Sequence, residues 1–295
     1  MEPLLDRLPA GARVLLVRLR SLGDCVLTTP AVEILKSHRP DLRLGLMVEP
    51  RFSAVFEGNP DVEHILDPRP AWPGDLCLNL HGGTRSMFLT ATSRARWRAG
   101  FAHFRAPWIY NVRIPTAQQI LGVSRKVHTA EHLASAIFYL GAPQREIPRA
   151  RLFVAPAPST RSYAILHPFA SAPAKTWPAE RFVELGRALG LEAVIIGGVH
   201  DDFAPFAGFR TLRGAPLKEV MSLIAGSSLL VGNDSGPAHV AAALGTPLVA
   251  LFGASDPLVW SPWKAHSRML VAVSGMSSIS VTEVLKAIDS LKVAA

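Results

Sequence analysis

Short apolar runs alternate along the chain with longer segments in which apolar positions recur every three or four residues. A short apolar run bounded by turn residues is typical of a buried strand, and the longer period is typical of a helix. Strands are predicted at residues 13–19, 42–48, 76–80, 164–167, 193–196, 228–232 and 248–252. Helices are predicted at residues 24–38, 85–92, 131–140, 178–189, 217–225 and 282–291. Because strands that alternate with helices form parallel sheets, this pattern predicts two open α/β sheets.

The two halves are separated by a segment, residues 148–162, that contains three prolines among several alanines. Such a composition is typical of a linker, and a chain of 295 residues is long enough for two domains. We therefore predict domains at residues 1–155 and 156–295. In open parallel sheets ligands bind at the carboxyl ends of the strands, so we expect the site in a cleft between the domains.

The composition excludes several classes of protein. Hydrophobic residues make up 49% of the chain and charged residues 18%, which excludes a disordered chain. The longest apolar stretch, residues 238–254, is interrupted by polar residues, glycine and proline, and a membrane-spanning helix needs about 20 mostly apolar residues. The N-terminus lacks the pattern of a secretory signal, and two cysteines are too few for a disulfide framework, so we expect a cytoplasmic protein.

The charge balance predicts an anionic partner. The chain has 31 Lys and Arg and 23 Asp and Glu, a formal net charge of +8. Nucleic acid, an anionic membrane surface and a phosphorylated substrate all fit this charge, and so does an ordinary solvated surface. Basic residues are densest at residues 85–105, where Arg94, Arg96 and Arg98 alternate.

Three segments at predicted strand ends carry candidate chemistry. In the first, RLRSLGD at residues 18–24, Asp24 begins a helix and is either an N-cap or a general base. In the second, HPFASAPAKTWPAERF at residues 167–182, a loop lysine is well placed for a phosphate or is simply solvated. In the third, VGNDSGPAHVAAALG at residues 231–245, a strand runs into a helix start that either binds an anion or is only capped.

Other motifs are absent or weak. The chain has no GxxxxGK[ST] phosphate loop, no GxGxxG after its first strand and no Asp-x-Asp pair for a metal–diphosphate. His128, Glu131 and His132 fit the H-x-x-E-H pattern of one class of zinc peptidase, although an ordinary helix start explains them better. Cys25 next to Asp24 is a candidate nucleophile, but a buried apolar role is the better interpretation.

Together the three segments resemble one family, the heptosyltransferases of bacterial lipopolysaccharide synthesis (glycosyltransferase family 9). The resemblance covers nearly the whole chain and rests on VRLRSLGDCVLTTPAVEIL, HPFASAPAKTWP and DSGPAHVAAALGTPLVALFG in that order. It implies a GT-B fold, with two Rossmann-like domains that face each other across a cleft and a last helix (282–291) that packs back on the N-terminal domain. It also implies inverting transfer of a heptose from ADP-heptose without a metal ion or other cofactor.

The resemblance also implies roles for single residues. Asp24 matches the catalytic base, and Lys175 matches the residue that neutralises the leaving diphosphate. Acceptor-binding positions are matched by Arg18, Ser21 and Gly23. Donor-binding positions are matched by Ser171, Asp234, Ser235, Gly236 and His239, with Asp201 as the candidate for the nucleoside.

The implied partners are a nucleotide-sugar donor and an anionic lipopolysaccharide-core acceptor, with peripheral contact to the cytoplasmic face of the inner membrane. Nucleic acid becomes a minor possibility, because no basic-aromatic recognition motif is present. Other functions stay open: a GT-B enzyme for another nucleotide sugar, a nucleotide-sugar epimerase, a non-catalytic nucleotide-binding homologue and the zinc peptidase.

Overall fold

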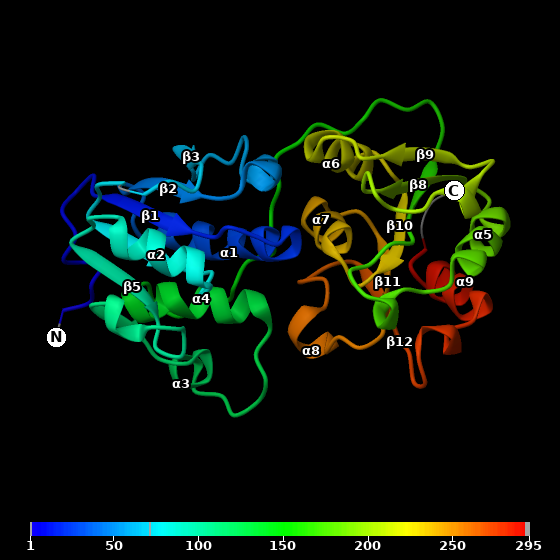
Figure 1. Ribbon diagram of the computed structural model, residues 1–295. Helices are drawn as coiled ribbons and strands as arrows, with labels where there is room; N and C mark the ends of the chain where they lie inside the picture. Colours follow the sequence, from blue (N-terminus) through cyan, green and yellow to red (C-terminus); the bar gives the residue numbers. More distant parts are fainter. Residues whose placement is uncertain (1, 71, 293–295) are drawn as a thin grey trace. The chain divides into compact units, whose positions relative to one another are not determined.

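The computed structural model describes residues 2–70 and 72–292, and the chain divides into two compact units, unit 1 (1–151) and unit 2 (152–295) (Figure 1). Each unit holds one six-stranded sheet in which all paired strands are parallel. Within the described residues, no helix has the length and apolar composition needed to cross a membrane.

The sheet of unit 1 has the strand order β3-β2-β1-β4-β5-β6. Its strands are β1 (Arg13–Val17), β2 (Arg43–Met47), β3 (His64–Leu66), β4 (Leu76–Asn79), β5 (Trp97–Phe101) and β6 (Val112–Ile114). Its helices are α1 (Leu22–His38), α2 (Thr84–Thr92), α3 (Ala117–Leu121) and α4 (Thr129–Leu140), with 3-10 turns η1 (Pro50–Val55) and η2 (Pro107–Ile109). Leu15 and Val17 of β1 pack with Leu89 of α2, and α1 packs on α4.

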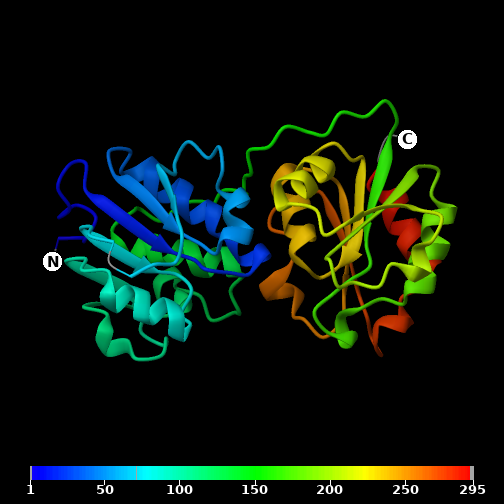
Figure 2. The same cartoon turned by 45° about the horizontal axis from the view of Figure 1, so that its top comes forward.

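The sheet of unit 2 repeats this arrangement, with the order β12-β11-β10-β7-β8-β9. Its strands are β7 (Tyr163–His167), β8 (Glu192–Gly197), β9 (Arg210–Arg213), β10 (Leu229–Asn233), β11 (Leu248–Phe252) and β12 (Ser267–Val271). Its helices are α5 (Ala179–Ala188), α6 (Leu217–Ala225), α7 (Gly236–Leu244), α8 (Pro257–Trp260) and α9 (Val281–Ser290), with 3-10 turns η3 (Pro173–Lys175), η4 (Ala204–Phe206) and η5 (Met276–Ser278). Figure 2 shows α6 and α7 on one face of this sheet and α5 and α9 on the other.

Numbered within each unit, both sheets have the order 3-2-1-4-5-6, the doubly wound order of a Rossmann fold. The connections leave the first strand in one direction and the fourth strand in the other, so a crevice opens where these two strands end. In unit 1 these strands are β1 and β4, and in unit 2 they are β7 and β10. The prediction of an α/β fold with two mostly parallel sheets is therefore confirmed.

The expectation that the last helix packs on the first domain is corrected by the position of α9. Its apolar side chains Val281, Val284 and Ala287 are buried in the core of unit 2, where the helix packs on α5 and β11. The helix has one apolar stripe, which is buried in this core, and the opposite residues Thr282 and Glu283 are exposed.

Candidate functional site

In unit 1, Asp24 lies in the first turn of α1, directly after β1 ends, and its carboxylate is held by two neighbours. The buried guanidinium of Arg18 donates one Nη to Asp24 Oδ1 and the other to the carbonyl of Leu80, at 2.6 Å. The other carboxylate oxygen accepts the Ser21 hydroxyl at 3.0 Å and the Ser21 N–H at 3.3 Å. The side chain of Asp24 keeps 21% of its surface exposed, so a carboxylate fixed on both oxygens still faces solvent.

The predicted acceptor-side residues Arg18 and Ser21 are thus in contact with Asp24, and Gly23 is buried in the first turn of α1. Cys25, next along the helix, does not behave as a nucleophile. It is fully buried, and burial raises the pKa of its thiol to about 12. Since only the thiolate is strongly nucleophilic, Cys25 serves the packing of α1.

The sequence interpretation missed two residues after β4, Asn79 and His81. Asn79 is fully buried; its Nδ2 donates to Tyr110 Oη at 2.9 Å and to Ser86 Oγ at 3.2 Å. Its Oδ1 accepts the backbone N–H groups of His81 (2.9 Å) and Gly82 (3.1 Å). The amide therefore fixes the loop that carries His81 beside β1.

His81 is an uncharged imidazole next to the Arg18–Asp24 pair. Burial lowers the pKa of His81, and the positive charge of Arg18 lowers it further. Its Nδ1 is buried and has no hydrogen-bond partner among the described residues. Only its place directly after a buried strand could have indicated this residue from the sequence.

The H-x-x-E-H segment is the start of α4, and its three side chains serve different contacts. His128 is the N-cap residue, and its Nδ1 accepts the N–H of Ala130 at 3.1 Å. Glu131 accepts the His128 N–H at 2.8 Å and pairs with Arg125. His132 stacks on the Phe101 ring at 4.0 Å between centroids. This is capping and packing, so the zinc peptidase interpretation is wrong.

His132 joins a group of rings that extends from β5. Its centroid lies 5.6 Å from that of His103, which in turn contacts Phe104 edge-on. Burial lowers the pKa of His132 to about 4, with a smaller repulsive contribution from His103. The rings therefore form an uncharged aromatic cluster. Within it, the charges of Arg18 and Asp24 also contribute to the pKa of His132.

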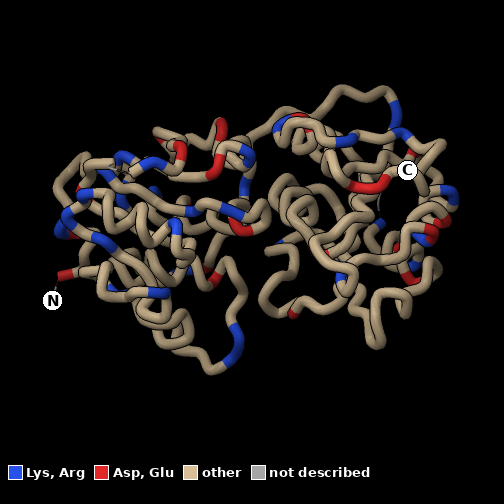
Figure 3. The backbone as a smooth tube through the Cα atoms, viewed as in Figure 1, with Lys and Arg blue, Asp and Glu red and all other residues tan. Residues whose placement is uncertain are grey.

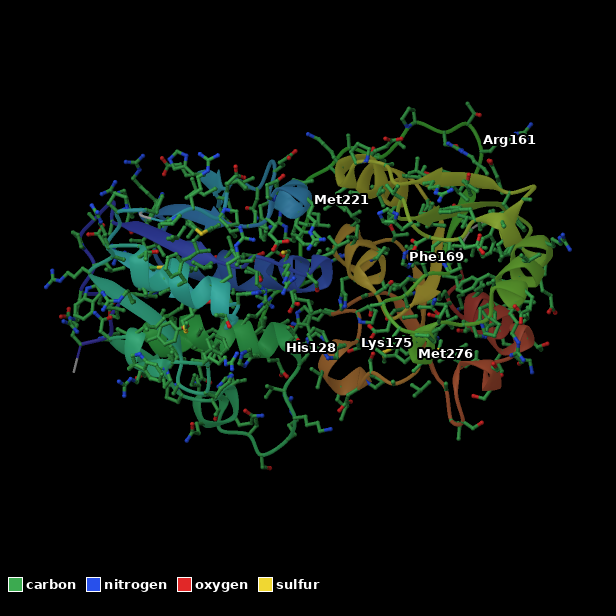
Figure 4. The ribbon with its side chains drawn as sticks, viewed as in Figure 1. His128, Arg161, Phe169, Lys175, Met221 and Met276 are labelled. Atoms are coloured by element: carbon green, nitrogen blue, oxygen red, sulfur yellow. The ribbon has the colours of Figure 1, made fainter. Side chains whose placement is uncertain are left out.

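In unit 2 a buried asparagine holds the two loops at the crevice. Asn233 ends β10, is fully buried, and accepts the N–H of Trp177 at 2.9 Å. Its Nδ2 donates to the carbonyl of Pro168, also at 2.9 Å. One side chain thus fixes both ends of the segment 168–177, on which Figure 4 labels Phe169 and Lys175.

We call Asn233, with its hydrogen bonds to the Trp177 N–H and the Pro168 carbonyl, the Asn233 clamp. It holds the segment that places Lys175 next to Asp234. Lys175 Nζ lies 3.5 Å from Asp234 Oδ2, and the lysine side chain is 31% exposed. Asp234 itself is held because its N–H donates to the carbonyl of Leu251 at 2.9 Å. The pair leaves a cation at the carboxyl end of β10, within reach of a ligand in the crevice.

The N-terminus of α7 adds a second electropositive element. Ser235 is the N-cap residue and Gly236 the first helical residue, followed by the buried His239 in the first turn. Helix starts present N–H groups and a partial positive charge to an anion. The hydroxyl of Ser235 lies 3.0 Å from both His167 Nδ1 and the carbonyl of Asn233. Burial lowers the pKa of His167 to about 4, so this histidine is neutral.

The other two predicted donor residues lie on neighbouring loops of unit 2. Asp201 follows β8, and its carboxylate accepts the N–H of Gly198 at 2.6 Å. It lies close enough to His167 to act on its pKa. Ser171 is exposed on the loop after β7. The described residues hold no group of three or more His, Cys, Asp or Glu arranged to bind a metal ion.

A sequence profile of glycosyltransferase family 9 (heptosyltransferase) matches residues 74–287. The chain belongs to glycosyltransferase family 9. It is therefore a glycosyltransferase, and the resemblance seen in the three sequence segments is confirmed. Lipopolysaccharide heptosyltransferase 3 of Escherichia coli is 26% identical to it over 295 aligned residues, which cover 83% of this chain and 84% of that protein.

Solved structures of the family share the fold. A glycosyltransferase family 9 protein of Veillonella parvula has a TM-score of 0.84 and 22% identity, covering 95% of this chain and 97% of the other. The Escherichia coli heptosyltransferase WaaC with ADP has a TM-score of 0.78 and 19% identity, covering 95% and 99%. These likenesses confirm the GT-B fold class. A more distant neighbour, TibC of enterotoxigenic Escherichia coli, is described as iron-containing (TM-score 0.65, 18% identity, covering 97% and 77%).

The Asn233 clamp gives a stability prediction. Asn233→Ala removes the acceptor of the Trp177 N–H and the donor to the Pro168 carbonyl, both of which are inside unit 2. Because buried unpaired groups cost about 1–3 kcal/mol each, we expect the free energy of unfolding to fall by about 2–4 kcal/mol in urea titrations. The exposed Ser171→Ala on the same segment is the control and should change it by less than about 0.5 kcal/mol. Equal losses in the free energy of unfolding for Asn233→Ala and Ser171→Ala would contradict the role given to the two Asn233 hydrogen bonds.

The low pKa of His132 predicts a loss of stability in acid. Its pKa is about 4 in the folded protein and about 6.5 in an unfolded chain, so protonation favours unfolding. The stabilising contribution is complete above about pH 6.5 and is lost as the pH falls toward 4. Between about pH 7 and about pH 5, we expect protonation of His132 to lower the free energy of unfolding by about 1–2 kcal/mol.

The measurement is the urea midpoint at the two pH values for the native chain and for His132→Gln, which does not titrate. The variant should lose less stability than the native chain. It will still lose some, because His167 in unit 2 titrates in the same range. An identical pH dependence of the two proteins would refute the burial of His132 as its cause.

Proposed function

We propose that this glycosyltransferase moves a heptose from ADP-heptose to the inner core of lipopolysaccharide, with inversion at the anomeric carbon. The family, the lipopolysaccharide heptosyltransferase among its relatives and the WaaC structure with ADP support this choice of substrates. In this proposal unit 1 binds the acceptor and unit 2 binds the nucleotide sugar. The reaction belongs at the cytoplasmic face of the inner membrane.

Asp24 carries the proposal. Inverting transfer needs a base that takes the proton of the acceptor hydroxyl as its oxygen attacks the anomeric carbon. The Arg18 guanidinium and the Ser21 hydroxyl orient the Asp24 carboxylate through hydrogen bonds to its two oxygens. One acceptor position remains, on Oδ1, because a carboxylate has about four lone-pair sites and three of them are occupied. Arg18, Ser21 and Gly23 line the acceptor side, and the neutral His81 offers its buried Nδ1 there.

Unit 2 stabilises the leaving ADP. Negative charge grows on the diphosphate as the sugar departs, and fixed positive groups lower the energy of that state. Lys175 supplies a full charge, and the start of α7 at Ser235 and Gly236 supplies N–H groups. Asp234, His239 and Ser171 complete the donor site, and Asp201 binds the nucleoside. With a lysine and a helix start in these places, the chemistry proceeds without a metal ion.

The base assignment is tested with Asp24→Ala and the isosteric Asp24→Asn. Both remove the proton acceptor, so we expect the transfer rate to fall by about 10²–10⁴-fold. ADP binding should remain, because the donor residues lie in unit 2. Asp67→Asn, which removes a carboxylate paired with Arg69 on the surface of unit 1, is the matched control and should stay fully active. Full residual transfer by Asp24→Asn would refute the role.

The donor assignment is tested by calorimetry with ADP, UDP and GDP. We expect ADP to bind best, and Lys175→Ala to weaken ADP binding at least tenfold while adenosine binding changes little, because the lysine meets the diphosphate. The exposed Lys286→Ala on α9 controls for the loss of one charge. Tight UDP binding without ADP binding would contradict the proposal that the donor is an ADP-sugar. Release of an isomerised sugar without acceptor would indicate an epimerase instead.

A further inference from the structure

The positive charge of the chain is concentrated in one segment. Residues 76–130 contain no Asp or Glu. They contain eight cations: Arg85, Arg94, Arg96, Arg98, Arg105, Arg113, Arg125 and Lys126. Because the formal net charge of the whole chain is +8, the remaining residues are balanced, and this segment holds the entire excess.

Within unit 1 the segment builds the β5–β6 side of the sheet, together with α2, η2 and α3. In Figure 3 the strand labelled β5 in Figure 1 and the loop after it carry blue segments and no red one. Arg94, Arg96, Arg98, Arg105 and Arg113 form no ion pair with any carboxylate of the described residues.

The opposite side of the same sheet is different, because its arginines are neutralised. Arg43 pairs with Glu63 at 2.6 Å, and Arg51 pairs with Glu49 at 2.9 Å. On one side of the unit 1 sheet Arg43 and Arg51 are therefore paired, whereas on the other side five arginines of the segment lack a counter-charge among the described residues and its other two arginines, Arg85 and Arg125, pair with a carboxylate. An excess that is left unpaired on one side marks a surface for an anionic partner.

A tryptophan projects from this surface on a constrained turn. Trp108, in the centre of η2, is 75% exposed. Arg98 Nε donates to the carbonyl of Ile109 at 3.0 Å, and Arg113 Nε donates to that of Pro107 at 3.2 Å. Two of the segment's arginines thus hold the turn on either side of the tryptophan. A second aromatic residue, Phe88 of α2, is 56% exposed, and α2 packs near this turn.

We propose that the Trp108 turn and the arginines around it are a docking surface for an anionic phospholipid bilayer. Tryptophan prefers the level of the lipid headgroups, where its ring is apolar and its N–H remains hydrated. Arginines beside it meet the negative headgroups, and each contributes to binding. A double-stranded nucleic acid would satisfy the arginines, but its bases are already stacked and would leave the tryptophan ring without a partner. This inference rests on the membrane contact of the proposed function and assigns a surface to it.

The test is sedimentation of the full chain with vesicles of phosphatidylcholine alone or mixed with phosphatidylglycerol. We expect binding only to the anionic vesicles, with an affinity that falls as salt is added. The double variant Arg96→Gln with Arg105→Gln should bind about 25-fold more weakly, since each juxtamembrane cation is worth about fivefold. Trp108→Ala should also weaken binding, while leaving the charge unchanged.

The control is Arg43→Gln with Arg51→Gln, which removes the same charge from the paired side of the sheet. It should bind vesicles like the native chain. Equal losses from both double variants would overturn the proposal, because net charge alone would then explain binding. So would equal binding to both kinds of vesicle, or binding to an oligonucleotide that the vesicles do not displace.

Transfer assays separate this proposal from the proposed function. The Arg96 and Arg105 double variant should transfer normally to a delipidated acceptor and poorly to an acceptor embedded in vesicles. Loss of transfer to both acceptors would overturn the docking role. Failure of the native chain to transfer to either acceptor, with vesicle binding intact, would contradict the proposed function and leave the docking surface supported.

Discussion

A buried amide at the end of the fourth strand is the constraint on which the candidate residues of each unit depend. In unit 1 this residue is Asn79 and in unit 2 it is Asn233, and neither is exposed to solvent. A buried asparagine is costly unless its donor and acceptor atoms are both paired. At the end of a central strand the available partners are the loops beside it, so pairing the amide also fixes those loops. The positions of His81 and Lys175 follow from this requirement.

The candidate residues of the two units share a second feature, a cation placed against a carboxylate where the first and fourth strands end. Arg18 meets Asp24 in unit 1, and Lys175 meets Asp234 in unit 2. The histidines beside them, His81 and His167, have a pKa lowered by burial and stay neutral. The fold therefore keeps the number of charges small and their positions definite, which is a condition for electrostatic catalysis in a crevice.

Much of this architecture could be predicted from the sequence, because buried strands of a parallel sheet are continuous apolar runs. The strands β1, β2, β4, β7, β8, β10 and β11 were predicted for this reason. The strands β3, β5, β6, β9 and β12 were missed, since strands toward a sheet edge are short or partly exposed. At the start of β5 the alternation of Arg96 and Arg98 with Trp97 and Ala99 is a strand pattern that was interpreted only as charge, although Arg96 itself precedes the strand.

The site was predicted only as far as its chemistry lay in contiguous segments. Asp24, Lys175 and the helix start at Gly236 each lie in a segment that follows a predicted strand, so their places could be predicted from order along the chain. The electrostatic effect of Arg18 on His81 and the hydrogen bonds of Asn233 with Pro168 and Trp177 join residues far apart in sequence, and no local pattern encodes them. The last helix was misplaced because one apolar stripe does not reveal which core it enters.

The Lys175–Asp234 pair has a consequence for the proposed donor site before a ligand binds. Lys175 already faces the Asp234 carboxylate at 3.5 Å, so Asp234 serves as its counterion. The pair therefore has little net positive charge with which to attract an anion. A single inorganic ion must compete with Asp234 for one lysine, whereas a ligand that also reaches the helix start and the nucleoside loop gains from several contacts at once. In the proposed donor site the pair would therefore favour multidentate ligands over single small anions.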